Sequence, residues 1–227
     1  AFMAEVYGRL TGNPAGCLGT LGPGATNLLT GVADGNMDRA PMVVITGQVP
    51  THLIGNDAFQ EVDIVGITRP CTKHNYLVKR VEDLAQTVKQ AFHIARSGRP
   101  GPVLIDLPKD IANNCTDYNG QTPVNLKSYH PTYAPNIKQL QKVCTLIESA
   151  KRPVVFAGGG IILSGSAAEL TAFVKTARIP VTASLMGLGA YPGTDPLWLG
   201  MIGMHGTYRA NMCTAACDLL ISVGVRL

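Results

Sequence analysis

Three glycine-punctuated segments of this sequence carry the polar side chains best suited to contact a small ligand. They are GPGATN at residues 22–27, GQVPTHLIGNDAFQE at 47–61 and SGRPGPVLIDLPKD at 97–110. The last two adjoin continuous apolar runs, so their polar residues fall in loops at strand ends. In open parallel sheets such loops collect ligands, because helix N-termini there present free N–H groups to anions.

Glycines also follow three predicted strands in the second half of the chain. GGG occupies residues 158–160, GMHG 203–206 and GVR 224–226. A glycine lets the backbone approach a phosphate or a flavin closely. GGG alone is as often a simple turn and is not a GxGxxG fingerprint. Together the three runs are stronger evidence for a ligand site, because they fall on the same edge of the inferred sheet.

Alternating helical and strand patterns indicate a layered α/β fold with parallel sheets. Residues 42–46 and 103–107 are apolar runs typical of strands inside a parallel sheet. Residues 81–95 repeat apolar side chains at three- and four-residue steps and stop before Gly98, a good helix terminator. Helices at 1–11 and 25–35 and a short strand at 17–21 complete a first domain over residues 1–111.

Residues 112–135 lose this periodicity among Asn, Thr, Tyr, Pro and Gly, which predicts an interdomain linker. A second α/β rhythm then covers residues 136–227, with strands at 154–157, 181–184 and 219–223. Asn136 should cap a helix, and Ser166 and Glu169 form a capping-box pattern. The first helix of this domain should turn four residues toward the core: Ile137, Leu140, Cys144 and Ile147. A doubly wound sheet should continue beyond residue 227.

Composition excludes several classes of function. The chain has 227 residues, 46% of them hydrophobic, and a net charge of +4 that is spread along the sequence. Without a basic run interleaved with aromatics, no nucleic-acid partner is expected. The longest apolar stretches have strand length, so no membrane span is expected, and no signal peptide opens the chain. Six cysteines without a CxxC pair favour a reducing compartment and predict no metal site.

Eight motifs in order make the whole chain similar to the acetolactate synthase large-subunit family of thiamine diphosphate (ThDP) enzymes. They are GPGATN, TGQVP, GNDAFQE, TKHNYLV, SGRPGPVLIDLPKD, GGG, LMGLGAYPGTDP and GMIGMHGTYRAN. The resemblance implies a parallel-sheet pyrimidine-binding domain, followed by part of a doubly wound central FAD-binding domain. It places the family's pyrophosphate-binding domain outside this sequence.

The resemblance also implies a chemistry. The family condenses pyruvate with a second 2-keto acid to 2-acetolactate or 2-aceto-2-hydroxybutyrate, in branched-chain amino acid biosynthesis, with ThDP, Mg²⁺ and FAD as cofactors. The family's essential glutamate matches a position before Ala1, and Glu5 is not that residue. The Mg²⁺ site belongs to the third domain. We therefore expect no catalytic residue in this chain, and no activity from it alone.

Site residues follow from matching positions. Five residues should line the substrate channel, with Gln60 close to ThDP: Pro50, Ala58, Phe59, Gln60 and Lys109. Ten should contact FAD: Arg99, Gly158, Gly159, Gly160, Ser184, Leu185, Met204, His205, Gly224 and Arg226. The Lys109 ammonium would attract the carboxylate of a 2-keto acid. We expect the glycine-rich and basic turns to converge along a common rim.

Each of these residues has a structural alternative. Lys109 could instead pair with Asp106 or Asp110, Phe59 could be an ordinary core aromatic, and Arg99 could be a solvated turn residue. His205 could be a satisfied surface or core histidine. The segment 22–27 could simply start a helix.

The resemblance further implies a homodimer or homotetramer, because the family's ThDP site forms between two subunits, and a possible regulatory small subunit. Localisation would be cytoplasmic in a bacterium or in a plastid or other organelle. Two alternatives stay open: a fragment of a pyruvate oxidase or glyoxylate carboligase, and a non-enzymatic flavin-binding or interaction module.

Overall fold

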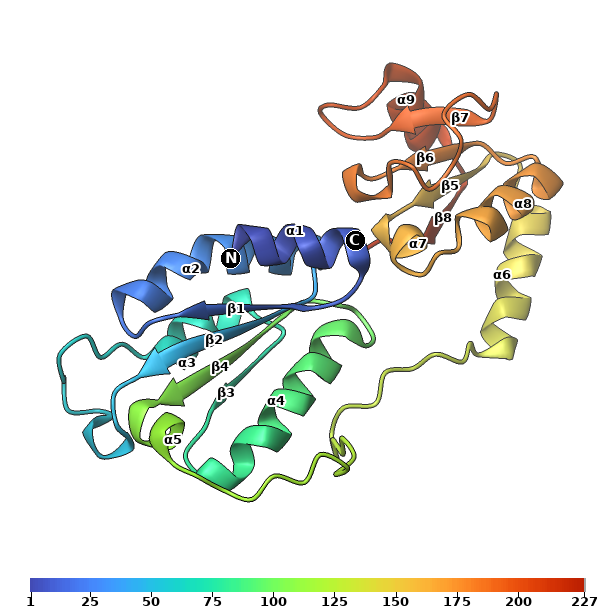
Figure 1. Cartoon of the computed structure of the whole chain (residues 1–227). Coiled ribbons are helices and arrows are strands. Elements are labelled where there is room, and N and C mark those ends of the chain that lie inside the picture. The colour runs from blue at the N-terminus through green and yellow to red at the C-terminus, as the bar shows by residue number, and fades with distance from the viewer. Residues whose placement is uncertain (227) are drawn as a thin grey trace. The chain divides into compact units, whose positions relative to one another are not determined.

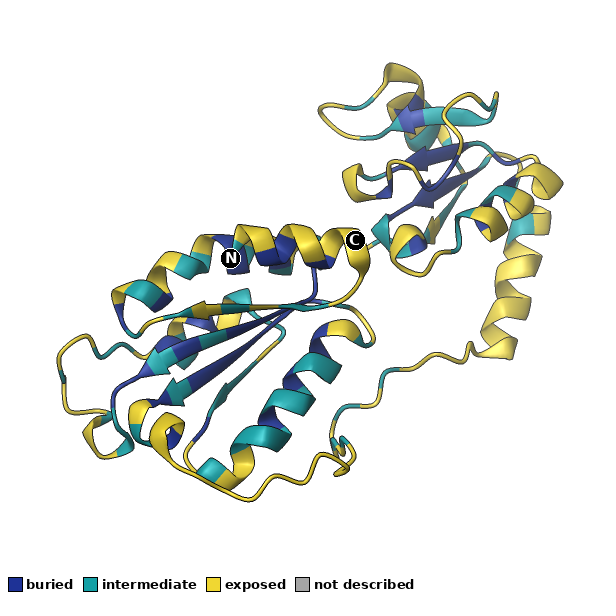
Figure 2. Cartoon of the chain, in the orientation of Figure 1, coloured by how far each residue is buried: buried dark blue, intermediate teal, exposed yellow. Residues whose placement is uncertain are grey.

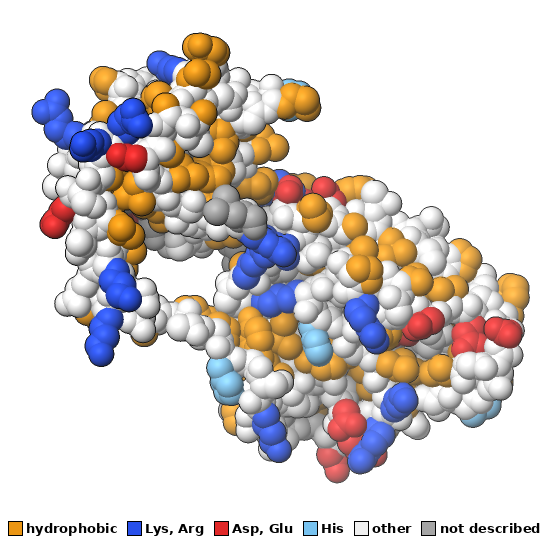
Figure 3. All heavy atoms as spheres, turned by 180° about the vertical axis from the view of Figure 1, so that it is seen from behind, with side chains coloured by type: hydrophobic (Ala, Val, Ile, Leu, Met, Phe, Trp, Pro, Cys, Tyr) orange, Lys and Arg blue, Asp and Glu red, His pale blue; other side chains and the backbone are white. Residues whose placement is uncertain are grey.

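The computed structural model describes residues 1–226 in two compact units, the first spanning Ala1–Tyr133 and the second beginning at Ala134 (Figure 1). Each unit is built on its own parallel sheet, which confirms the predicted α/β fold class. Lys and Arg side chains form several separate groups on the face in Figure 3, in keeping with the dispersed charge of the sequence.

The first unit contains four parallel strands in the order β1-β2-β4-β3. They are β1 (Ala15–Gly19), β2 (Met42–Gln48), β3 (His74–Leu77) and β4 (Pro102–Pro108). The central strands β2 and β4 are almost wholly buried (Figure 2). Their β-branched side chains fit a sheet covered on both faces.

Helices cover both faces of this sheet. On one face Val44 and Leu104 share a core with α1 (Phe2–Thr11), α2 (Pro23–Asp38) and α3 (Ile64–Thr68). On the other, Val43 and Ile105 pack with α4 (Val81–Arg96). Gly98 has φ 55° just after α4, as its predicted role as terminator requires. The short η1 (Thr51–Leu53), η2 (Arg69–Cys71) and α5 (Lys109–Asn113) complete the unit.

The irregular stretch 114–133 lies along α4. Leu126 and Tyr129 pack against the core beneath that helix, and the Gln86 side chain donates to the carbonyl of Pro123 over 3.2 Å. Most of the predicted linker therefore belongs to the first unit.

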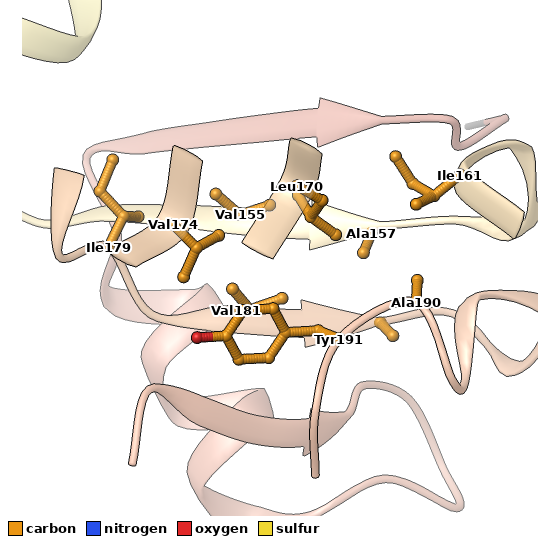
Figure 4. Packing of buried hydrophobic residues seen from close by; sticks show 10 residues of the cluster. Val155, Ala157, Ile161, Leu170, Val174, Ile179, Val181, Ala190 and Tyr191 are labelled. Carbon is orange, nitrogen blue, oxygen red and sulfur yellow. The ribbon is translucent and has the colours of Figure 1, made fainter. Parts of the chain in front are cut away.

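The second unit has four parallel strands in the order β7-β6-β5-β8. They are β5 (Pro153–Ala157), β6 (Val181–Ala183), β7 (Trp198–Met201) and β8 (Leu219–Val223). The helical elements are α6 (Ile137–Ser149), α7 (Gly159–Leu163), α8 (Ala167–Ala177), η3 (Leu185–Gly187) and α9 (Tyr208–Ala216). In the core, Leu170 and Val174 of α8 face Val155 and Val181 of the sheet, with Tyr191 beside them (Figure 4).

The predictions for helix α6 are right about its cap and wrong about its inward face. Asn136 does cap α6, since its Oδ1 accepts from the N–H of Gln139 at 3.2 Å. The expected inward face of α6 is wrong: Ile137 is 62% and Leu140 46% exposed, and Cys144 is exposed too (Figure 2). Only Ile147, in the last turn, reaches the core. Within the described residues nothing covers Ile137, Leu140 and Cys144.

Ser166 does stand immediately before α8, but the predicted capping box is not formed. The residue has φ −95° and ψ 25°, outside the extended region typical of a capping residue, and its hydroxyl instead accepts from Ser164 Oγ at 2.9 Å. None of the helices in residues 1–226 is long and apolar enough to cross a lipid bilayer.

Candidate functional site

A cavity of about 550 Å³ opens at the carboxyl edge of the first sheet. The ends of β1, β2 and β4 supply its floor, through residues such as Leu18, Thr46 and Leu107. The cavity loop, residues 49–62, forms a wall. In parallel sheets this edge is where ligands bind, because side chains and free N–H groups of several loops meet there.

All five predicted channel residues line this one cavity: Pro50, Ala58, Phe59, Gln60 and Lys109. Their elements differ, since four come from the cavity loop and Lys109 begins α5 directly after β4. Phe59 is 87% exposed, which excludes the alternative of a core aromatic. Its ring is free to contact a ligand.

Lys109 does not form either of the ion pairs proposed as its structural alternative. Asp110 accepts from the backbone N–H of Thr51 at 3.0 Å and from its hydroxyl at 2.5 Å. Asp106 is buried and faces away, toward β2. Among residues 1–226 no carboxylate pairs with Lys109, so its ammonium is available to an anionic ligand.

The turn at Gly22 determines where Gln60 lies. Gly22 has φ 54°, and a Cβ built on it would come within 2.4 Å of the Gln60 carbonyl oxygen. Gln60 itself has φ 62°. The segment 22–27 therefore does start helix α2, as its structural alternative held, and also provides the close backbone contact that holds Gln60 at the cavity.

A buried polar network that sequence reasoning missed lies beneath the cavity. Thr46 and Gln48 of β2 donate to the two carboxylate oxygens of Asp106 on β4, at 2.8 and 3.0 Å. All three side chains are at most 6% exposed. The signal was available: TGQ and IDLP place polar residues in strands that are otherwise apolar.

Burial raises the pKa of Asp106 to about 6, because the charged carboxylate is removed from water. Donation from Thr46 and Gln48 opposes the rise, and the negative charge of Asp63 adds to it. The pKa of Asp110 is held below its ordinary value, chiefly by the Thr51 hydroxyl. At neutral pH both groups are therefore carboxylates.

In the second unit the GGG run at 158–160 meets the turn at Gly224 at the carboxyl edge of the sheet. The Gly158 N–H donates to the carbonyl of Val223 at 2.9 Å, and that of Gly160 to the carbonyl of Gly224 at 3.0 Å. A Cβ on Gly158 would come within 2.3 Å of the Gly224 oxygen. Only glycine permits this backbone contact.

Nine of the ten predicted FAD residues follow strands β5, β6, β7 or β8 and so share this edge. His205 and Met204 lie on the exposed loop after β7, which rules out a core role for the histidine. Two hydrogen bonds between Gly203 and Asn211, of 2.9 and 3.0 Å, hold that loop. Leu185 and Arg226 are exposed after β6 and β8.

Arg99 lies elsewhere. It precedes β4, at the amino end of the strand, whereas Lys109 follows the carboxyl end. The expectation of a common rim is therefore wrong within the first unit, because the turns before and after one strand lie at opposite edges of a sheet. Arg99 is exposed and has interactions within the chain.

Comparison with known proteins matches both units to one superfamily. Residues 1–67 match the N-terminal TPP binding domain of thiamine pyrophosphate enzymes, and residues 140–227 match their central domain. The acetolactate synthase large subunit of Buchnera aphidicola subsp. Acyrthosiphon pisum is 51% identical over 99% of this chain and 40% of its own length. The isozyme 3 large subunit of Escherichia coli is 50% identical, with 99% and 39% covered.

This chain belongs to the acetolactate synthase large-subunit family. A plant relative shows how widely the family extends: acetolactate synthase 2, chloroplastic, of Nicotiana tabacum is 51% identical over 99% of this chain and 34% of its own length. The chain thus spans about two fifths of the length of the bacterial relatives it matches. The cavity lies in the unit that carries the ThDP-binding domain match.

Proposed function

We propose that this chain is the part of an acetolactate synthase that forms one wall of the ThDP and substrate site. The observation that carries the proposal is the gathering of Phe59, Gln60 and Lys109 around one cavity at the carboxyl edge of the first sheet. The complete protein would condense pyruvate with a second 2-keto acid to 2-acetolactate or 2-aceto-2-hydroxybutyrate.

The cavity suits a flat heterocycle with a charged substrate beside it. Leu21 and Ile45 give it apolar walls, and Gly47 lets the backbone at Leu21 pack closely, since a Cβ there would lie 3.2 Å from the N atom of Leu21. Gln60 offers an amide for a polar ring edge. When bound, ThDP supplies the electron sink for decarboxylation of a 2-keto acid.

The residues of this chain would position and attract the reactants. Lys109 would draw in the carboxylate of the incoming 2-keto acid, because an unpaired ammonium at a cavity mouth raises the local concentration of anions. Phe59 would shield the site from water with its exposed ring. Among residues 1–226 no three His, Cys, Asp or Glu side chains gather in a group that could hold a metal ion.

The carboxyl edge of the second sheet would bind FAD. Close backbone contact of Gly158 and Gly160 with Gly224 brings the turns after β5 and β8 together at this edge, where a side chain would force them apart. Arg99, which precedes β4 in the first unit, is the tenth residue that the family resemblance assigns to FAD.

The complete protein would be at least a homodimer, and could associate with a regulatory small subunit, as the name "large subunit" of the relatives suggests. Exposed apolar side chains on α1 support self-association: Met3 is 90% and Leu10 80% exposed. A complete enzyme that stays active as a monomer would contradict the dimer.

The direct test is an assay of the complete protein that contains this segment, supplied with pyruvate, ThDP and Mg²⁺. Acetolactate and carbon dioxide should form only when ThDP is present. Formation of hydrogen peroxide would favour the pyruvate oxidase alternative, tartronate semialdehyde from glyoxylate would favour the carboligase, and no turnover would favour a non-enzymatic module.

A further inference from the structure

We infer that Gln48 is a positioning residue that fastens both ends of the cavity loop (residues 49–62) to the sheet, with Asp106 fixing its orientation. The inference rests on the proposed function only for the identity of the ligand. The contacts that carry it are in the first unit and involve no ligand.

One side chain reaches both ends of the loop. Gln48 Oε1 accepts from the N–H of Val49 at 2.8 Å, where the loop starts, and Nε2 donates to the carbonyl of Val62 at 3.0 Å, where it ends. The second hydrogen of Nε2 goes to Asp106 Oδ2 at 3.0 Å. Three of the four hydrogen bonds that a primary amide can form are thus made.

Asp106 determines which way the amide points. A carboxylate only accepts hydrogen bonds, so the NH₂ group of Gln48 must face it and the amide oxygen must face Val49. Thr46 holds the other carboxylate oxygen at 2.8 Å, which fixes Asp106 in turn. Because Gln48 is only 6% exposed, water cannot replace contacts that it loses.

Between its ends the loop is held to the rest of the unit by the contact of Gln60 with Gly22 and by Asp110, which binds Thr51. Its interior is closed on itself by Glu61, whose carboxylate accepts from the N–H groups of Gly55 and Ala58. Phe59, at its tip, is 87% exposed and anchors nothing. Asp110 holds Thr51 near the start, but Gln48 is the side chain that also reaches Val62. The placement of Gln60 at the cavity therefore depends on Gln48, which fixes both ends of the loop, as well as on the close contact with Gly22.

The test uses Gln48→Met in the complete protein, a change that keeps the length of the side chain and removes all three hydrogen bonds. Amide hydrogen exchange of peptides covering residues 49–62 should become roughly ten-fold faster, since the loop opens locally, while peptides from β2 and β4 stay within about two-fold. The ThDP dissociation constant should rise roughly ten-fold, and kcat at saturating ThDP should change less than about three-fold.

Thr46→Val is the matched control. It removes a buried hydrogen bond to the same carboxylate but leaves both attachments of the loop, so it should lower the unfolding midpoint without faster exchange in residues 49–62. A merely structural role of the network would give the same exchange pattern in both variants. Gln86→Met, on the outer face of α4, should leave exchange and ThDP affinity unchanged.

If Gln48→Met does not fold, Gln48→Asn keeps the amide but is one methylene too short to span Asp106 and Val62, and should show the same direction of change. Unchanged exchange in residues 49–62 in a folded Gln48 variant would overturn the inference. Absence of ThDP-dependent acetolactate formation in the unaltered protein would instead overturn the proposed function, while the exchange result would stand.

Discussion

The hydroxyl of Thr46 donates to Oδ1 of Asp106 at 2.8 Å, joining two residues that are register partners on β2 and β4. The bond is buried, and the Asp106 carboxylate is only 2% exposed on the central strand β4. A buried carboxylate is costly when ionised, which gives the fold a pH dependence.

Asp106→Asn should remove that dependence. The folded-state pKa is raised to about 6, so between pH 4 and 6 the folded chain keeps a proton that the unfolded chain has lost. Stability attributable to Asp106 is therefore fully present below about pH 4 and falls as pH rises, by roughly 3 kcal/mol at pH 7. From pH 4 to 7 the urea-unfolding midpoint of the variant should rise relative to that of the wild type. A constant difference across this range would contradict the raised pKa.

Gly22→Ala should weaken ThDP binding. The new Cβ would meet the Gln60 oxygen at 2.4 Å and must push the cavity loop away. Gly12→Ala is the control, because Gly12 also has a positive φ, 70°, but has open space around it. This variant should lose only the backbone contribution to stability, about 1 kcal/mol. Equal ThDP dissociation constants for the two variants would argue against a role for this contact.

Lys109→Met should raise the KM for pyruvate roughly ten-fold at low ionic strength, since the attraction for the substrate carboxylate is lost. The difference from wild type should shrink as salt is added. Lys142→Met, an exposed lysine on α6, is the control. Steady-state kinetics at two salt concentrations would reveal the effect; a KM that matches wild type at both would remove Lys109 from the substrate path.

Gly158→Ala should reduce the flavin content of the complete protein, because its Cβ would fall 2.3 Å from the Gly224 oxygen and separate the two turns. Gly165→Ala is the control, with φ 69° and no atoms nearby. Flavin absorbance per protein after gel filtration measures the loss. Equal retention by both variants would mean that this edge does not hold FAD.

Arg99→Ala tests the other part of the FAD assignment. If the guanidinium contacts FAD, the variant should retain less flavin after gel filtration, whereas Arg96→Ala, three residues earlier at the end of α4, should retain it fully. Retention equal to wild type would leave Arg99 with the solvated-turn role that its exposure also allows.

Buried regular elements could be predicted from sequence because a single pattern specifies them. The predicted strands at 42–46 and 103–107 and the predicted helix at 81–95 appear as β2, β4 and α4. Each observed element extends at most two residues beyond its predicted ends. The short strands β3 and β7 were missed: each has four residues and lies at a sheet edge, where half-exposed side chains leave little periodicity.

The site could be predicted in part. Motif order indicated the loop that carries Phe59 and Gln60, but the positive φ of Gln60 and its contact with Gly22 arise from packing between segments far apart in sequence. Gln48 was overlooked because the predicted strand ended at residue 46 and left Gln48 in the following loop, whereas β2 extends to Gln48 and the structure places Asp106 beside it. The prediction that the basic turns share one rim was wrong for Arg99. In the sequence, the loop before a strand and the loop after it are both polar and look alike.

We propose that the cavity beside Gln60 binds ThDP. Equilibrium dialysis of ThDP against the complete protein carrying Gln60→Ala tests it most directly, with Gln86→Ala as control. The dissociation constant of ThDP should be roughly ten-fold higher for Gln60→Ala and unchanged for Gln86→Ala. Equal affinity in both variants and the wild type would contradict it.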